Sequence, residues 1–89
     1  MSELARLRAR IEALDDQLVD LLAARADLVG EIWAHKEAAG VPRLDQVREA
    51  AEIERMAERA LDRGLDPDGV REVAERVVGR DLRAARRSR

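Results

Sequence analysis

Apolar residues recur at alternating spacings of three and four along the first part of the chain. This period places them on one face of an α-helix, whose successive residues are about 100° apart. Ser2 and Glu3 suit an N-cap and a first-turn acid, and Gly40 with Pro42 gives the first firm stop. The pattern predicts one long helix over about 3–39. Its apolar stripe consists of Leu4, Leu7, Ile11, Leu14, Leu18, Leu21, Arg25, Leu28 and Ile32.

Two shorter helices are predicted after the long one. Asp45 is placed to cap a helix over about 45–63, which Gly64 ends as a C-terminal glycine. Pro67 lies in the first turn of a third helix, over about 67–86, because proline lacks an N–H that the first turn does not need. The buried sides predicted for these helices are Val47, Ala51, Met56 and Ala60 in the second and Val70, Val73, Ala74, Val77, Val78, Leu82 and Ala85 in the third.

The predicted first helix is too long for a compact single chain. At 1.5 Å per residue it would measure about 55 Å, whereas a compact domain of 89 residues has a radius of gyration of about 12 Å. Hydrophobic residues make up 46% of the chain, and many of them are alanines, so one copy has little to bury. We expect a single all-α domain over 1–89, in which a second copy of the chain covers the long helix.

Composition excludes several classes of function. The chain has no cysteine, which excludes thiolate catalysis, and its one aromatic residue, Trp33, argues against stacking on bases. It has neither an apolar run long enough for a membrane span nor the pattern of a signal peptide, so we expect a cytoplasmic protein without membrane contact. The tail at 80–89 holds five Arg and one Asp, but no nucleic-acid-reading motif accompanies it, and we expect no nucleic-acid binding. The single histidine, His35, lacks neighbours with metal-ligand spacing, so no metal site is expected.

Arg25 occupies a position in the apolar stripe where the pattern calls for leucine or valine. Two interpretations stay open for it. Its stem could lie along the stripe while the guanidinium reaches water or an acid of a partner helix. Alternatively, the planar guanidinium could hold a carboxylate or a phosphate. Lys36, the sole lysine among 17 basic residues, lies three helical turns further along a nearby face.

A second group of charges, Asp45, Arg48 and Glu49, begins the second predicted helix. Ordinary helix-start chemistry accounts for each one separately, with Asp45 as the N-cap, Glu49 as a first-turn acid and Arg48 as a surface residue. Their spacing relative to the earlier cations favours a shared site instead.

Together, these positions resemble those of the small all-helical chorismate mutases. The resemblance rests on Leu7-Arg8-x-x-Ile11-x-x-Leu14-Asp15, Leu21-Leu22-x-x-Arg25-x-x-Leu28, Lys36, Val41-Pro42, Asp45, Arg48-Glu49 and Leu65-Asp66-Pro67. It implies three helices per chain, long, short and medium, in an intertwined homodimer whose active sites use both chains. It also implies a dicarboxylate substrate, chorismate, that is rearranged to prephenate in aromatic amino-acid biosynthesis. This pericyclic step requires no cofactor, metal or covalent intermediate.

The resemblance implies a role for each of three cations. Arg8 would be donated from the partner chain to a substrate carboxylate. Arg25 would anchor a carboxylate within its own chain. Lys36 would reach both a carboxylate and the ether oxygen of the breaking bond, where fixed positive donors stabilise developing charge.

The resemblance further implies that Asp45, chiefly through its backbone, and Glu49 meet the ring hydroxyl, while Arg48 orders this cluster. The third helix departs from the family, because Asp81 and Ala85 stand where serine and glutamine are common. A lost donor at the ether oxygen can cost roughly 3 kcal/mol. These departures are compatible with a shifted helix, an Asp81 paired with arginine, low intrinsic activity, an altered substrate or a tail rearranged by a partner.

Alternatives to the chorismate reaction therefore remain. The same scaffold could eliminate pyruvate from isochorismate, or rearrange 4-amino-4-deoxychorismate, whose amino group a carboxylate such as Asp81 would favour. The dimer could also be a weakly active docking protein that an enzyme of the shikimate pathway activates, with the Arg-rich tail as its contact.

Overall fold

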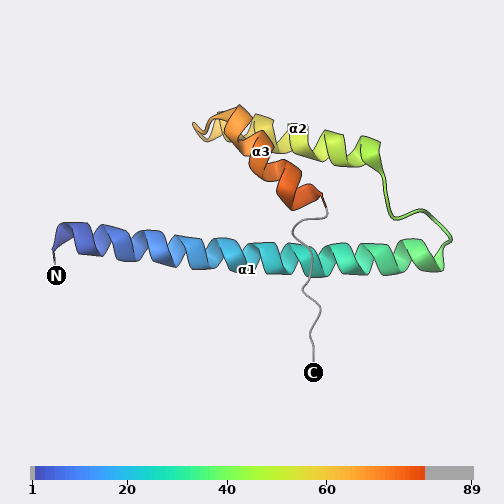
Figure 1. Cartoon of the computed structure of the whole chain (residues 1–89), viewed down its shortest axis with the longest axis horizontal. Coiled ribbons are helices and arrows are strands. Elements are labelled where there is room, and N and C mark those ends of the chain that lie inside the picture. Colours follow the sequence, from blue (N-terminus) through green and yellow to red (C-terminus); the bar gives the residue numbers. More distant parts are fainter. Residues whose placement is uncertain (1, 80–89) are drawn as a thin grey trace, which may run out of the picture.

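The computed structural model describes residues 2–79, which form three α-helices and no strand. The helices are α1 (Glu3–Ala38), α2 (Gln46–Asp62) and α3 (Pro67–Val78). In Figure 1, α1 is a long rod, α2 runs back above it, and α3 descends from the end of α2 toward the middle of α1. The predicted all-helical chain of three helices is confirmed for this range. The expected continuation of the third helix to 86 and the basic tail at 80–89 lie outside it.

Glycine turns end the first two helices. Gly40 follows α1 with a φ of 71°, a left-handed conformation that glycine adopts without a steric penalty. The N–H of Val41 then donates to the carbonyl of Lys36 at 2.8 Å, which satisfies a carbonyl that has no partner within the helix. Gly64 ends α2 in the same way, with a φ of 75°.

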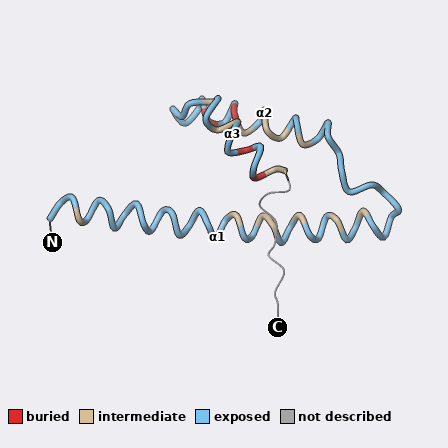
Figure 2. The backbone as a smooth tube through the Cα atoms, viewed as in Figure 1, coloured by how far each residue is buried: buried red, intermediate tan, exposed pale blue. Residues whose placement is uncertain are grey.

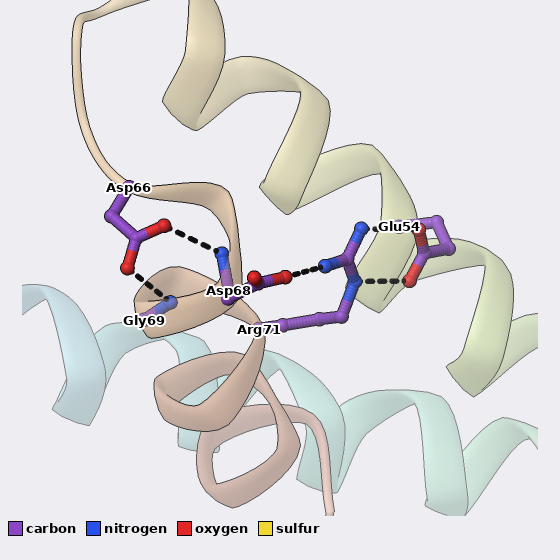
Figure 3. Close-up of polar contacts among 5 residues, drawn as sticks. All are labelled: Glu54, Asp66, Asp68, Gly69 and Arg71. Carbon is purple, nitrogen blue, oxygen red and sulfur yellow. Dashed lines mark hydrogen bonds and ion pairs between the residues drawn. The ribbon is translucent and has the colours of Figure 1, made fainter.

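Aspartate side chains begin the two shorter helices. Asp45 Oδ1 accepts a hydrogen bond from the N–H of Arg48 at 3.0 Å. Asp66 accepts from the N–H groups of Asp68 and Gly69, each at 3.2 Å, as Figure 3 shows. Both caps satisfy N–H groups that lack partners in the first turn of a helix.

Helices α2 and α3 pack together as a hairpin. Arg71 on α3 donates from Nε and Nη2 to the two carboxylate oxygens of Glu54 on α2, at 2.7 and 3.0 Å, and from Nη1 to Asp68 at 2.6 Å (Figure 3). Small side chains allow the helices to approach closely. The buried residues of the described chain, coloured red in Figure 2, are Ala57, Ala60, Ala74 and Val77.

Helix α1 has no buried residue along its 36 positions. Its apolar stripe stays open, and Leu21, for example, is 68% exposed. The chain has a radius of gyration of 16.5 Å and extents of 57 × 39 × 15 Å, well beyond a compact domain of this length. Val47, Ala51 and Val73, expected on buried sides, are also exposed, because the hairpin buries only the positions where its two helices face each other. A single chain therefore leaves most of its apolar surface uncovered.

Candidate active site

A cavity of about 500 Å³ lies where α1, the 39–45 loop and the open end of the α2–α3 hairpin meet. This volume falls within the range of small-molecule sites. Helix α1 contributes one wall, the loop and the start of α2 contribute the second, and the end of α3 closes one side. The lining residues are Arg25, Leu28, Val29, Ile32, Trp33, Lys36, Arg43, Leu44, Asp45, Arg48, Glu49, Glu52, Val77, Val78 and Gly79.

The cavity combines an apolar wall with charged side chains of both signs. Leu28, Val29 and Ile32 form the apolar part on α1. The charged side chains are Arg25, Lys36, Arg43 and Arg48 on the positive side and Asp45, Glu49 and Glu52 on the negative side. Such a lining suits a small anion that also carries a polar or cationic substituent.

Arg25 is half-buried and links α1 to α3. Its Nη1 donates to the carbonyl of Val77 at 3.0 Å, in the last turn of α3. A guanidinium has five N–H donors, so this bond leaves donors for a ligand. The side chain lines the cavity, and its role as an anion site stays a prediction.

Lys36 is half-buried at the end of α1. Its Nζ donates to the backbone carbonyl of Arg43 at 3.1 Å, which keeps the ammonium beside the loop. The Arg43 guanidinium lies over the ring of Trp33, 5.2 Å from its centroid, and Nη2 donates to Glu37 at 3.2 Å. An ammonium has three donors, so Lys36 retains hydrogen-bonding capacity toward the cavity.

The start of α2 supplies a cluster of charges on one side of the cavity. Asp45 acts as the N-cap, so one of its carboxylate oxygens is occupied by the N–H of Arg48. Arg48 is exposed at the rim, and Glu49, in the first turn, is half-buried.

Glu52 is a third carboxylate on the same wall, one turn beyond Glu49. Hydrogen bonds from Arg55, at 2.6 to 3.2 Å, lower the pKa of Glu52 against a smaller opposing effect of burial. The charges of Arg25 and Arg48 lower this pKa further. Glu52 is therefore ionised at neutral pH.

The structure brings together most of the residues predicted for the site, namely Arg25, Lys36, Asp45, Arg48 and Glu49. Arg8 does not line the cavity. It lies 17 residues before Arg25 on the same helix, about 25 Å away at 1.5 Å per residue. Asp81 and Ala85 lie outside the described residues.

Trp33, Arg43 and Glu52 line the cavity but were not predicted as site residues. Glu52 could have been predicted from the sequence, because it follows Glu49 by three residues on a helix and so shares its face. No sequence pattern predicts Trp33 and Arg43 at the site, since their contact depends on the path of the loop.

In residues 2–79, no three His, Asp or Glu side chains lie close enough together to hold a metal ion. Within the same range, no helix is both long and apolar enough to cross a membrane.

Comparisons with known proteins add an independent line of evidence. The profile of the family described as chorismate mutase type II matches residues 7–82. The T-protein of Enterobacter agglomerans is 36% identical over 78 residues, 88% of this chain and 21% of that protein. A 4-amino-4-deoxychorismate mutase of Streptomyces venezuelae is 42% identical over 65 residues, 73% of this chain and 63% of that protein. The chain thus spans less than two thirds of either relative. No solved structure matches it significantly.

Proposed function

The chain belongs to the chorismate mutase type II family, and we propose that it converts chorismate to prephenate. The observation that carries this proposal is the gathering of Arg25, Lys36 and Arg48 around one cavity of small-molecule size. The substrate is a dicarboxylate, and these three cations come from two helices, α1 and α2, that line the same cavity.

The proposed reaction is a rearrangement within one molecule. The ether C–O bond breaks while a C–C bond forms, and no atom is transferred to or from the protein. The protein contributes by holding the side chain of the substrate over its ring and by placing positive donors where negative charge develops on the ether oxygen. Arg25, with its planar guanidinium, suits a carboxylate, and the compact ammonium of Lys36 suits the ether oxygen.

The remaining lining residues complete this assignment. Glu49 and the backbone around Asp45 would hold the ring hydroxyl, and Arg48 would balance the charge of this cluster. The apolar wall on α1 would pack against the ring and exclude water, which strengthens the charged contacts in the cavity. Asp81 and Ala85 remain predicted neighbours of the substrate.

We further infer that two chains pair in an intertwined homodimer. The support is the apolar stripe of α1, whose leucines and isoleucines are 44–68% exposed in the described chain. The midpoint of Glu3–Ala38 lies between residues 20 and 21. If two copies of α1 run antiparallel about this point, Arg8 lies opposite residue 33 of the partner, beside the partner's cavity. This arrangement would give Arg8 its predicted contact with a substrate carboxylate.

The direct test is turnover of chorismate by the purified chain, followed by chromatography of prephenate. Arg25→Ala and Lys36→Ala should each lower kcat/KM at least a hundredfold, since one preorganised donor is worth about 3 kcal/mol. Arg63→Ala is a matched control, because Arg63 is exposed at the opposite end of α2. Equal activity in all four proteins would exclude this cavity as the site.

A second substrate is favoured by one observation. Glu52 adds an ionised carboxylate to the cavity beside Asp45 and Glu49, and a relative 42% identical is named a 4-amino-4-deoxychorismate mutase. The amino group of that compound is cationic and would compete with Arg55, which donates hydrogen bonds to Glu52, for this carboxylate. Side-by-side kinetics of both compounds test this, with Glu52→Gln as the variant. Loss of activity on the amino compound alone would support it, and equal effects on both would remove it.

The docking alternative is tested in the same assay. Addition of the first enzyme of the shikimate pathway should raise kcat if the chain depends on a partner. Full activity of the chain by itself, unchanged by the addition, would remove that alternative.

A further inference from the structure

One arginine side chain fastens the 39–45 loop to α1. The Arg43 guanidinium lies 5.2 Å from the centroid of the Trp33 ring, within the range of a cation–π contact. Its Nη2 also donates to Oε2 of Glu37 at 3.2 Å. Trp33 and Glu37 are four residues apart and therefore neighbours on one face of α1. Arg43 in the loop thus contacts two successive turns of α1.

The backbone of the same residue holds the lysine of the cavity. Lys36 Nζ donates to the Arg43 carbonyl at 3.1 Å. The long lysine side chain would otherwise sample many rotamers, and ordering it at the moment of reaction would be unfavourable. The side chain of Arg43 fixes the loop, and its carbonyl in turn fixes the ammonium.

We propose that Arg43 is a positioning residue, which clamps the loop on Trp33 and Glu37 so that its carbonyl holds the Lys36 ammonium in the cavity. This inference rests on the proposed function for its catalytic consequence. The positioning itself can be measured without turnover, so the two can fail separately.

A simpler alternative is that Arg43 acts only as a further cation that attracts the substrate. The ion pair with Glu37 offsets much of that charge. The two explanations also predict different kinetic effects of a substitution at Glu37. Glu37→Gln removes a negative charge near the cavity, so simple attraction predicts a lower KM for an anionic substrate. The clamp predicts a lower kcat instead, because the loop loses one of its two attachments.

The chain provides two unique probes for the first experiment. Lys36 is its only lysine and Trp33 its only aromatic residue. Labelling with ¹⁵N-lysine therefore gives one side-chain ammonium signal, and tryptophan fluorescence reports one ring. We expect Arg43→Ala to shift or broaden the Lys36 signal and to expose Trp33 to iodide quenching, while Arg63→Ala changes neither. An unchanged Lys36 signal in Arg43→Ala would overturn the proposal, even if the chain proved inactive on chorismate.

Kinetics on chorismate provide the second experiment. We expect Arg43→Ala to lower kcat roughly two- to thirtyfold with KM unchanged, since exposed cation–π contacts and ion pairs are individually weak. Arg43→Lys, which keeps a charge but stacks less well, should recover part of the loss. A double variant with Glu37→Gln should lose no more than Arg43→Ala alone, because both changes release the same loop. Additive losses, or an effect confined to KM, would contradict the clamp.

Discussion

Replacement of Leu18 by aspartate tests whether α1 requires a second copy of the chain. Leu18 lies on the apolar stripe near the middle of α1 and is 56% exposed in the single chain. Full burial of a leucine is worth about 1.5–3 kcal/mol, so pairing would gain roughly half of that at this position. The residue occurs twice in a dimer, which makes the lost burial about 1.5–3 kcal/mol per dimer.

The new carboxylate adds a larger penalty than the lost burial. An unpaired charge in an apolar interface costs several kcal/mol. Together the two effects exceed about 4 kcal/mol, which corresponds to a dissociation constant raised at least about a thousandfold. Leu18→Met, a change that conserves volume, should have little effect and serves as the control.

Sedimentation and thermal unfolding measure this effect. For a dimer of two 89-residue chains that unfolds as it dissociates, the Tm should rise by about 4 °C for each tenfold increase in concentration. Leu18→Asp should sediment as a chain of 10.0 kDa and lose activity in parallel. A parent protein that sediments at 10.0 kDa with a Tm independent of concentration would refute the reasoning.

Three further changes probe individual side chains. Arg25→Lys keeps the charge but loses the planar fork, and we expect kcat/KM for chorismate to fall about ten- to a hundredfold, since a charge-assisted hydrogen bond contributes about 1.5–3 kcal/mol. Asp66→Ala removes the cap of α3 and should lower the free energy of urea unfolding by about 1 kcal/mol per chain, whereas Asp66→Asn should retain most of it. Hydrogen bonds from Arg71 lower the pKa of Glu54 below its ordinary value of 4.5, so this pair stabilises the fold above that pH and the contribution is lost as the pH falls. Between about pH 6 and pH 3, Arg71→Ala should therefore lose less unfolding free energy than the parent, and identical slopes would contradict this.

Local chemistry made much of the fold predictable from the sequence. The period of the leucines gave α1, while Asp45, Asp66 and Gly64 marked helix ends through side-chain capping and a left-handed turn. These signals act over a few residues and therefore do not depend on tertiary structure. The exposure of Val47 was not predictable in the same way, because a helical period identifies an apolar face but not what covers it.

Among the residues that line the cavity, local patterns again predicted some, and others depended on tertiary structure. Arg25 was recognisable because a charge interrupts an otherwise apolar stripe, and the family resemblance set the register of Lys36 and Glu49. The contact between Arg43 and Trp33 was hidden, since it depends on how the loop turns back over α1. Arg8 illustrates a further limit, because the cavity predicted for it belongs to another chain.

Arg25 both binds the Val77 carbonyl of α3 and lines the cavity. Val77 lies in the last described turn of α3, so Arg25 links this end of the helix to α1. The same guanidinium lines the cavity, so the proposed binding of a carboxylate there would be thermodynamically linked to the placement of that helix end. Linkage is reciprocal: whatever factor the helix end contributes to anion affinity, a bound anion contributes to the stability of the helix end. A change that moves the Val77 carbonyl can thus alter the cavity without touching a ligand.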